Sequence, residues 1–366
     1  MTIHIDENIP LLAEALTPFL PPSLTIERFQ GRTLKREDLR DCTALCVRST
    51  TRVNATLLQD TPVRFVGTAT SGTEHVDAAY LRASGREFHD AKGCNANSVA
   101  EYVVFSILHW ANKYNLDLRN KTLGVVGYGN IGRRVAELAY RLGLRLLVSD
   151  PPLKEAGGKF APYCRNVSFD ALLQESNIIT NHVHYLADGV FPTVGLFDDH
   201  AFESIKPNTL FIHASRGGIV REEALWRVVG EKNIVPVVDV WEAEPRVHTG
   251  LTEHSLLATP HTAGYSYEGK INGSVMIATA CCDFLERTVD SAIDADWGLF
   301  ERALANNNLP VLHFGDHASI YRALRESRRL EEDTANLRRI ADTPDQETRF
   351  DALRKEYPKR REILLG

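Results

Sequence analysis

The chain has 366 residues, of which 43% are hydrophobic and 25% charged, a globular composition long enough for about two or three domains. Its formal net charge of −6 argues against a general nucleic-acid binder, which would need a basic face. No apolar run approaches the roughly 20 residues of a membrane span, and the N-terminus lacks a signal-peptide pattern. We therefore expect a cytoplasmic protein without nucleic-acid or membrane partners.

The cysteines agree with a reducing compartment. They form no Cys-x-x-Cys pair, and Cys281 and Cys282 are adjacent, which is awkward for a disulfide. Reduced thiols are the simpler interpretation in a chain of this length. We expect no metal site.

The first predicted strands cover residues 2–5, 44–47 and 63–68. The last two run into hydroxyl-rich turns, which contain Ser49 and Thr70. Such turns offer N–H and O–H donors to an anion, although ordinary capping chemistry favours the same residues. Arg48 adds a cation beside them, which favours an anion site. A helix predicted at 98–110 is apolar almost all round and should be buried.

Residues 121–151 have the order of a βαβ dinucleotide-binding unit. An apolar run at 122–126 predicts a strand, and Gly127, Gly129 and Gly132 follow at G-x-G-x-x-G spacing before a helix pattern that ends near 141. In such a unit the pyrophosphate of the dinucleotide binds at the helix N-terminus. A second strand, at 144–148, ends at Asp150, at about the spacing of the acid that binds the ribose of NAD. The alternative is a packed βαβ unit whose glycines serve only tight turns.

Three chemically distinct residues follow later strands. Strands are predicted at 178–183, 209–213, 234–238 and 255–258. Arg216 follows the second of these strands, Glu244 the third and His261 the fourth. Each residue alone could be structural, but ligands of an open α/β sheet bind at the carboxyl ends of its strands. Together they supply a proton acceptor, a cation for a carboxylate and a carbonyl oxygen, and an acid that orients the imidazole. These are the groups that oxidation of a secondary alcohol requires.

Charge density rises from about residue 291, and helical spacing dominates to the end. The charge run at 325–333 is typical of a solvated helix face. We expect a small extra domain that serves assembly rather than chemistry.

Several segments resemble the D-2-hydroxyacid dehydrogenases over nearly the whole chain. Four occur in the family's order and spacing: VGYGNIGRR, HASRGGIV, VVDVWEAEP and TPHTAGY. Others narrow the resemblance to one branch of the family: DENIP, VRSTTRVN, FVGTATSGTEHVD, GCNANSVAEYV and AGYSYEGK. The tail segment FDALRKEYPKRREI resembles that branch's C-terminal dimerisation domain.

The resemblance implies an α/β protein with two Rossmann-like doubly wound domains. These would be a discontinuous, flavodoxin-like substrate domain at 1–95 and 265–290 and an NAD-binding domain at 96–264. A small α+β dimerisation domain at 291–366 would make the protein a homodimer.

The resemblance also implies roles for individual residues. Arg216 would bind substrate, Glu244 would be the acid partner, and His261 the proton donor or acceptor. The cofactor, NAD, would contact Gly127, Gly129, Asn130, Ile131, Gly132, Asp150, Val183, Ala214, Ser215, Arg216, Asp239 and Gly264. The substrate would contact Arg48, Ser49, Thr70 and Tyr265.

The chain departs from the family pattern in two places. Asn181-His182-Val183-His184-Tyr185 stands where members usually have His-Thr-Pro-Leu, so a hydroxyl is missing at Val183. His213 and Ser215 stand where the family has Asn and Cys. These departures affect the fine cofactor contacts rather than the reaction.

The expected function is NAD-dependent oxidation of a small phosphorylated 2-hydroxy acid. Arg48 is the first candidate for its phosphate, and Arg360 or Arg361 of a second copy is a weaker one. The alternatives are a dehydrogenase of another D-2-hydroxy acid, such as 3-phosphoglycerate or glycerate, a non-catalytic NAD(H)-sensing protein, and an inactive relative kept for assembly.

Overall fold

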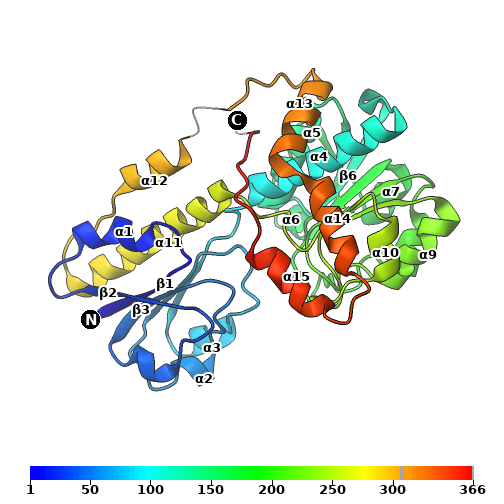
Figure 1. Ribbon diagram of the computed structural model, residues 1–366. Coiled ribbons are helices and arrows are strands. Elements are labelled where there is room, and N and C mark those ends of the chain that lie inside the picture. The colour runs from blue at the N-terminus through cyan, green and yellow to red at the C-terminus, as the bar shows by residue number, and fades with distance from the viewer. Residues whose placement is uncertain (306–308, 365–366) are drawn as a thin grey trace. The chain divides into compact units, whose positions relative to one another are not determined.

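The chain divides into two compact units in the computed structural model, which describes residues 1–305 and 309–364. The first unit contains Met1–Asn95 and Ser266–Leu309, and the second contains Ala96–Tyr265 and Pro310–Gly366 (Figure 1). Residues 291–305 thus group with the first unit, and residues 310–364 group with the second. The separate dimerisation domain expected from the sequence stays a prediction.

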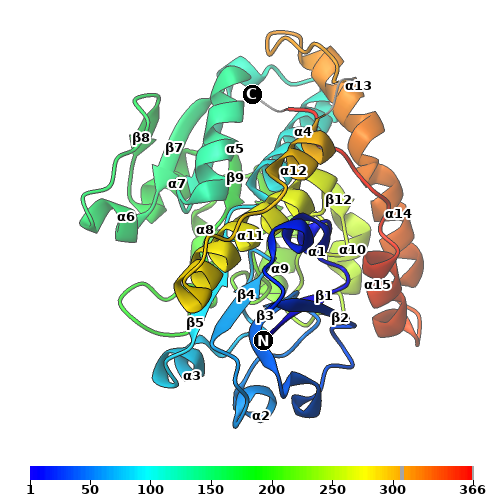
Figure 2. The same cartoon turned by 90° about the vertical axis from the view of Figure 1, so that its left-hand side faces the viewer.

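The first unit is built on a parallel sheet with the order β2-β1-β3-β4-β5, a flavodoxin-like order. Its strands are β1 (Thr2–Asp6), β2 (Thr25–Phe29), β3 (Cys42–Val47), β4 (Phe65–Thr68) and β5 (Glu87–Asp90). Its helices are α1 (Leu12–Leu16), α2 (Ala55–Leu58), α3 (Ala78–Ala83), α11 (Tyr267–Val289) and α12 (Trp297–Leu304), with short 3₁₀ turns η1 (Thr17–Phe19) and η2 (Arg36–Leu39). Helices α1, α11 and α12 share one core and lie together in Figure 2, whereas α2 and α3 belong to another.

The second unit is built on a larger parallel sheet with the order β12-β11-β10-β9-β6-β7-β8. Its strands are β6 (Thr122–Val126), β7 (Arg145–Ser149), β8 (Cys164–Asn166), β9 (Ile178–Asn181), β10 (Leu210–His213), β11 (Val235–Val238) and β12 (Leu257–Ala258). The strand order reverses between β6 and β9. In doubly wound sheets this switch point is where dinucleotides bind.

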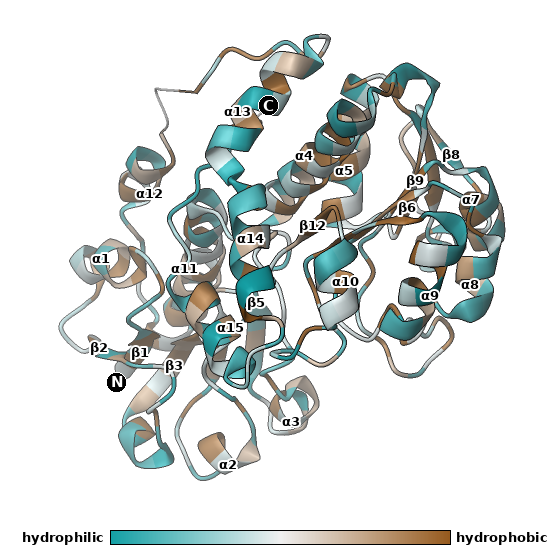
Figure 3. Cartoon of the chain, turned by 45° about the vertical axis from the view of Figure 1, so that its right-hand side comes forward, coloured by the Kyte–Doolittle hydropathy of each residue, from teal (hydrophilic) through white to brown (hydrophobic). Residues whose placement is uncertain are grey.

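Helices cover both faces of the second sheet. They are α4 (Ala96–Tyr114), α5 (Asn130–Arg141), α6 (Pro151–Glu155), α7 (Phe169–Glu175), α8 (Asp199–Ser204), α9 (Glu222–Lys232) and α10 (Thr249–His254), with η3 (Leu118–Asn120). Helices α4 and α5 belong to one core, and α7, α8 and α9 to the other. Figure 3 shows hydrophobic colouring along β6 and β9 and hydrophilic colouring on α9 and α10. None of the helices in the described residues combines the length and apolarity needed to cross a membrane.

The C-terminal segment adds helices to both cores of the second unit. They are α13 (His317–Arg328), α14 (Leu330–Ile340) and α15 (Gln346–Lys355). Ile320 and Leu324 join the core of α4 and α5, and Leu337 and Phe350 join the other core. Residues 310–364 contain no strand, so the α+β description expected for this segment is corrected to a helical one.

A buried carboxyl group holds the chain's last described residues on the second unit. Glu101 of α4 is fully buried, and its Oε1 accepts the backbone N–H groups of Ile363 and Leu364, each at 2.6 Å. Arg134 of α5 donates to the Leu364 carbonyl oxygen. Burial raises the pKa of Glu101 to about 7, although the charge of Arg328 and the tail N–H groups oppose this rise.

We expect this carboxyl group to make stability depend on pH. Between about pH 4.5 and 7 the folded chain holds a proton on Glu101 that the unfolded chain has released, so stability falls as pH rises through this window. At about 1.4 kcal/mol per pKa unit, the fall amounts to roughly 3 kcal/mol. Glu101→Gln should remove this contribution. Urea unfolding at both ends of the window measures it.

The exposed Glu253 of α10 provides the matched control, because Glu253→Gln should leave the pH dependence of wild type intact. A pH dependence of Glu101→Gln equal to that of wild type would show that Glu101 does not titrate as described.

Candidate active site

The glycine-rich turn after β6 has the geometry that a pyrophosphate needs. Gly127 has a φ of +88°, which favours glycine, and a Cβ on Gly132 would lie 2.0 Å from the Gly127 carbonyl oxygen. A Cβ on Gly129 would meet nothing within 4 Å. Helix α5 begins at Asn130 without a side-chain cap from Gly129. The turn therefore packs tightly on one side and presents an uncapped helix N-terminus on the other.

Asp150 lies at the end of β7, next to this turn. Its Oδ2 accepts the N–H of Tyr128 at 2.6 Å, and its Oδ1 accepts the N–H of Leu153 at 2.9 Å. Asp150 thus ties the glycine-rich turn to the start of α6. Each carboxylate oxygen can accept a further bond, so this structural role is compatible with binding a ribose hydroxyl.

The two departures from the family pattern meet at the ends of β9 and β10. Asn181 and His213 are partners in the sheet register, and the Asn181 amide nitrogen lies 3.2 Å from His213 Nδ1. The Ser215 hydroxyl donates to the Asn181 side-chain oxygen. Burial lowers the pKa of His213 to about 3, so this histidine is neutral. His213 and Ser215 therefore form one hydrogen-bonded network with Asn181.

Strand β9 ends at Asn181, two residues earlier than the sequence predicted, because the chain then turns against Gly127. A Cβ on Gly127 would lie 2.9 Å from both the His182 carbonyl oxygen and Val183 Cγ1. Val183 thus lies beside the glycine-rich turn. It offers an apolar surface there in place of a hydroxyl.

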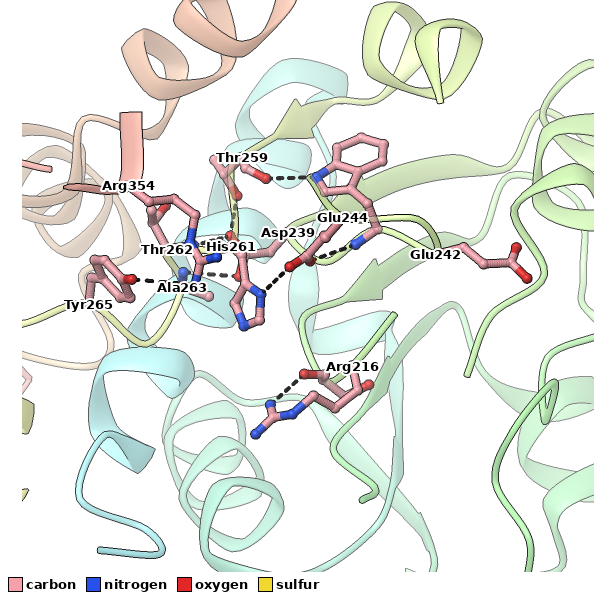
Figure 4. A network of polar contacts seen from close by, with 12 residues as sticks. Arg216, Asp239, Glu242, Glu244, Thr259, His261, Thr262, Ala263, Tyr265 and Arg354 are labelled. Atoms are coloured by element: carbon pink, nitrogen blue, oxygen red, sulfur yellow. Dashed lines mark hydrogen bonds and ion pairs between the residues drawn. The ribbon is translucent and has the colours of Figure 1, made fainter. Parts of the chain in front are cut away.

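Glu244 and His261 form a hydrogen-bonded pair. His261 Nδ1 lies 2.8 Å from Glu244 Oε2, and Glu244 Oε1 accepts the backbone N–H of Trp241 at 3.0 Å. Figure 4 shows the other ring nitrogen, Nε2, turned toward the side chain of Arg216. Arg216 follows β10, and its Nη1 donates to the Ser215 carbonyl oxygen at 2.8 Å. The structure thus gathers the three residues that the sequence singled out, each after the end of a strand.

Glu244 is held in its charged form. Burial alone would raise the pKa of this carboxyl. The hydrogen bond and charge of His261 outweigh burial, with help from the Trp241 N–H and the charge of Arg354, so the pKa of Glu244 lies below its ordinary value. A charged Glu244 fixes the imidazole orientation and stabilises the imidazolium.

The segment that carries His261 is held by a buried carboxylate. Asp239 Oδ1 accepts the Thr259 hydroxyl at 2.6 Å and the Thr262 N–H at 2.7 Å, and Oδ2 accepts the Ala263 N–H at 3.0 Å. His261 itself has a φ of +55° and donates its N–H to the Asp239 carbonyl oxygen at 2.8 Å. A positive φ at a histidine is strained and persists only where neighbours impose it. Asp239 supplies those contacts.

The C-terminal segment holds the same stretch from its other end. Arg328, which is 2% exposed, donates to the carbonyl oxygen of Ala263 at 2.9 Å and also binds Ser98 of α4. The Ser98 hydroxyl donates to the same carbonyl oxygen at 2.8 Å. The segment expected only to serve assembly therefore also supports the stretch that carries His261.

The expected substrate residues are distributed over both units. Arg48, Ser49 and Thr70 follow β3 and β4, which are paired strands of the first unit. Arg48 donates to the Asn8 carbonyl oxygen at 3.2 Å. Burial lowers the pKa of Lys270, and the charge of Arg48 lowers it further. Lys270 is thus a second cation near Arg48 that the sequence analysis did not single out, although it ends the quoted segment AGYSYEGK.

Tyr265 lies in the second unit, where Arg354 of α15 approaches its hydroxyl at 3.4 Å (Figure 4). No feature of the sequence pointed to Arg354. Arg360, a weaker candidate for the substrate phosphate, is almost fully buried and pairs with Asp333 of its own chain at 3.1 Å. Its Nη2 is therefore already engaged by a carboxylate of the same chain.

Comparisons with known proteins find a matching family model and relatives that cover nearly the whole chain. The family model described as D-isomer specific 2-hydroxyacid dehydrogenase, NAD binding domain, matches residues 104–263. The erythronate-4-phosphate dehydrogenase of Pseudomonas syringae is 39% identical, and the match covers 99% of this chain and 93% of that protein. The protein of the same name from Escherichia fergusonii is 36% identical, with 99% and 92% covered.

Solved structures show the same fold at lower identity. The D-lactate dehydrogenase of Aquifex aeolicus, solved with NAD and lactic acid, superposes with a TM-score of 0.62 and 22% identity. The match covers 79% of this chain and 96% of that one. The apo D-lactate dehydrogenase of Escherichia coli gives a TM-score of 0.63 at 19% identity, with 79% and 98% covered.

Proposed function

Since the chain belongs to the erythronate-4-phosphate dehydrogenases of the D-isomer-specific 2-hydroxyacid dehydrogenase family, we propose that it oxidises 4-phospho-D-erythronate with NAD. The product is (R)-3-hydroxy-2-oxo-4-phosphobutanoate, an intermediate of pyridoxal 5′-phosphate (vitamin B6) biosynthesis. The observation that supports this proposal is the hydrogen-bonded Glu244–His261 pair facing Arg216, in a chain that matches such a relative over 99% of its own length.

The residues divide the reaction between them. His261 Nε2 takes the proton of the substrate's C2 hydroxyl, while Glu244 holds the imidazole through Nδ1. Arg216 binds the carboxylate and the oxygen that becomes the carbonyl, for which a planar guanidinium fork is suited. NAD, when bound, accepts the hydride from C2. The proton and the hydride together account for the oxidation of the alcohol to a ketone.

The glycine-rich turn is the proposed cradle of NAD, because its packed Gly132 and open Gly129 match what a pyrophosphate needs. Asp150 binds the ribose beside it. The remaining proposed cofactor contacts lie in the turn and at the ends of the sheet strands: Gly127, Asn130, Ile131, Val183, Ala214, Ser215, Arg216, Asp239 and Gly264.

The substrate contacts of the proposal are Arg48, Ser49, Thr70 and Tyr265. Arg48 is a cation beside two turns rich in N–H and O–H donors, which suits a phosphate or a carboxylate. Homodimerisation through the C-terminal segment is part of the same proposal, and sedimentation of the full chain tests it. A cytoplasmic location agrees with six cysteines that are all free thiols.

Formation of NADH by the purified chain tests the reaction. We expect kcat/KM to be higher with 4-phospho-D-erythronate than with 3-phospho-D-glycerate or D-glycerate. A higher kcat/KM with 3-phospho-D-glycerate or D-glycerate would show that the protein is a dehydrogenase of that acid instead. Tight NADH binding without oxidation of any of the three would favour the non-catalytic, NAD(H)-sensing alternative.

A further inference from the structure

Arg354 brings a positive charge to the catalytic residues from the C-terminal segment. It lies on α15, with its guanidinium carbon 6.0 Å from the ring centre of Tyr265 and 5.9 Å from that of Phe350. Its charge contributes to the low pKa of Glu244. Figure 4 shows it on the Tyr265 side of His261. Arg354 is therefore near the reacting groups but outside the Glu244–His261 pair.

The guanidinium of Arg354 is poorly satisfied within its own chain. Its Nε is buried and has no hydrogen-bond partner, and its Nη2 makes one long contact, at 3.4 Å, with the Tyr265 hydroxyl. Over residues 1–305 and 309–364, no carboxylate forms an ion pair with it. A buried donor without a partner is costly. Nη2 carries two hydrogens and makes one long contact, so it retains the capacity to donate to an anionic ligand.

We propose that Arg354 is a specificity-determining residue that binds the phosphate of the substrate. This inference rests on the proposed function. The carboxylate of the substrate already has Arg216, whereas a phosphate of nearly two negative charges needs cations of its own. Arginine presents donors in a fork that fits two phosphate oxygens at once. Because the Nη2 contact with the Tyr265 hydroxyl is long, the terminal nitrogens of that fork can still donate to a ligand.

Tyr265 supports the assignment to the same ligand. Tyr265 lies four residues after His261, in a turn closed by the Tyr265 N–H, which donates to the Thr262 carbonyl oxygen at 2.9 Å. The Tyr265 hydroxyl lies next to Arg354. A phenol and a guanidinium side by side present O–H and N–H donors to one anion. In contrast, an arginine that served only to keep Glu244 charged would favour the reaction of any 2-hydroxy acid equally.

Steady-state kinetics with two substrates tests the proposal. The kcat/KM for 4-phospho-D-erythronate, divided by that for D-erythronate, measures how much the enzyme gains from the phosphate. We expect Arg354→Gln to lower this ratio about tenfold to a hundredfold, as for loss of a charge-assisted contact, mainly through KM for the phosphorylated acid. Arg354→Lys keeps the charge but not the fork, so its ratio should lie between those of wild type and Arg354→Gln.

Arg349→Gln is the matched control. Arg349 lies on the same helix, is exposed and pairs with Asp345 at 2.7 Å, so its loss should leave the ratio unchanged. Inhibition by inorganic phosphate, competitive with the phosphorylated acid, gives a second readout, and its Ki should rise in Arg354→Gln. Circular dichroism and the melting temperature establish that each variant is folded.

The outcomes separate the two proposals. Equal losses on both acids, or an unchanged phosphate Ki in a folded Arg354→Gln protein, would overturn the role of Arg354 and leave the reaction intact. A wild-type protein that fails to oxidise 4-phospho-D-erythronate would overturn the proposed function itself.

Discussion

His261→Asn should lower kcat by about two to four orders of magnitude, the contribution expected of a general base, while NAD binding is retained. Asparagine is the appropriate replacement because it adopts a positive φ readily, and the φ of His261 is +55°. It cannot accept the hydroxyl proton. NADH formation under saturating substrate measures kcat, and NADH fluorescence titration measures cofactor affinity.

Two comparisons sharpen this test. His254→Asn alters an exposed histidine of α10 and should leave kcat unchanged. Glu244→Gln keeps a side chain of the same size but removes the charge that stabilises the imidazolium, so it should also lower kcat. A His261→Asn protein with nearly full activity would exclude His261 as the proton acceptor.

That the three residues proposed for catalysis lie at one edge of the sheet could be predicted from the sequence, because each follows a strand. Apolar runs marked β10, β11 and β12, and the carboxyl ends of parallel strands share one edge of a sheet. That rule alone places Arg216, Glu244 and His261 within one region. The turn formed by Gly127, Gly129 and Gly132 was equally predictable. Their G-x-G-x-x-G spacing after a strand reflects the need for a tight turn and for close packing of helix on strand.

The missed strands have weak sequence signals. Strand β2 (Thr25–Phe29) lies at an edge of its sheet and is largely exposed, so it shows no clean apolar alternation. Strand β5 (Glu87–Asp90) is another half-exposed edge strand, and β8 (Cys164–Asn166) has three residues. Apolar patterning detects strands that bury side chains, so edge strands of this kind escape it.

The C-terminal cations could not be predicted because their partners are remote in sequence. Arg328 lies within a charge run that is typical of a solvated face, and its neighbours Arg325 and Arg329 are indeed exposed. Arg328 is buried because it binds the backbone carbonyl of Ala263, and Ser98 of α4. A backbone carbonyl has no sequence signature. Only the fold reveals that the segment supports the stretch that contains His261.

Asp239→Asn should lower both stability and kcat. Asp239 accepts three hydrogen bonds, from the Thr259 hydroxyl and the N–H groups of Thr262 and Ala263. The amide NH₂ of an asparagine would face one of these donors, so we expect a loss of about 1–3 kcal/mol in the free energy of unfolding. Because His261 lies within this stretch, its displacement should also reduce kcat. Urea unfolding and NADH formation measure the two effects.

The two roles open to Asp239 make different predictions. The family resemblance implied a contact with NAD, and loss of that contact alone would raise the KM for NAD without changing stability. Burial raises the pKa of Asp239, and the charge of His261 and the three hydrogen bonds oppose this rise. Burying a carboxyl group costs desolvation energy, which the three hydrogen bonds to Asp239 offset. A variant with wild-type stability and a raised KM for NAD would therefore assign Asp239 to the cofactor, whereas combined losses in stability and kcat would assign it to holding His261.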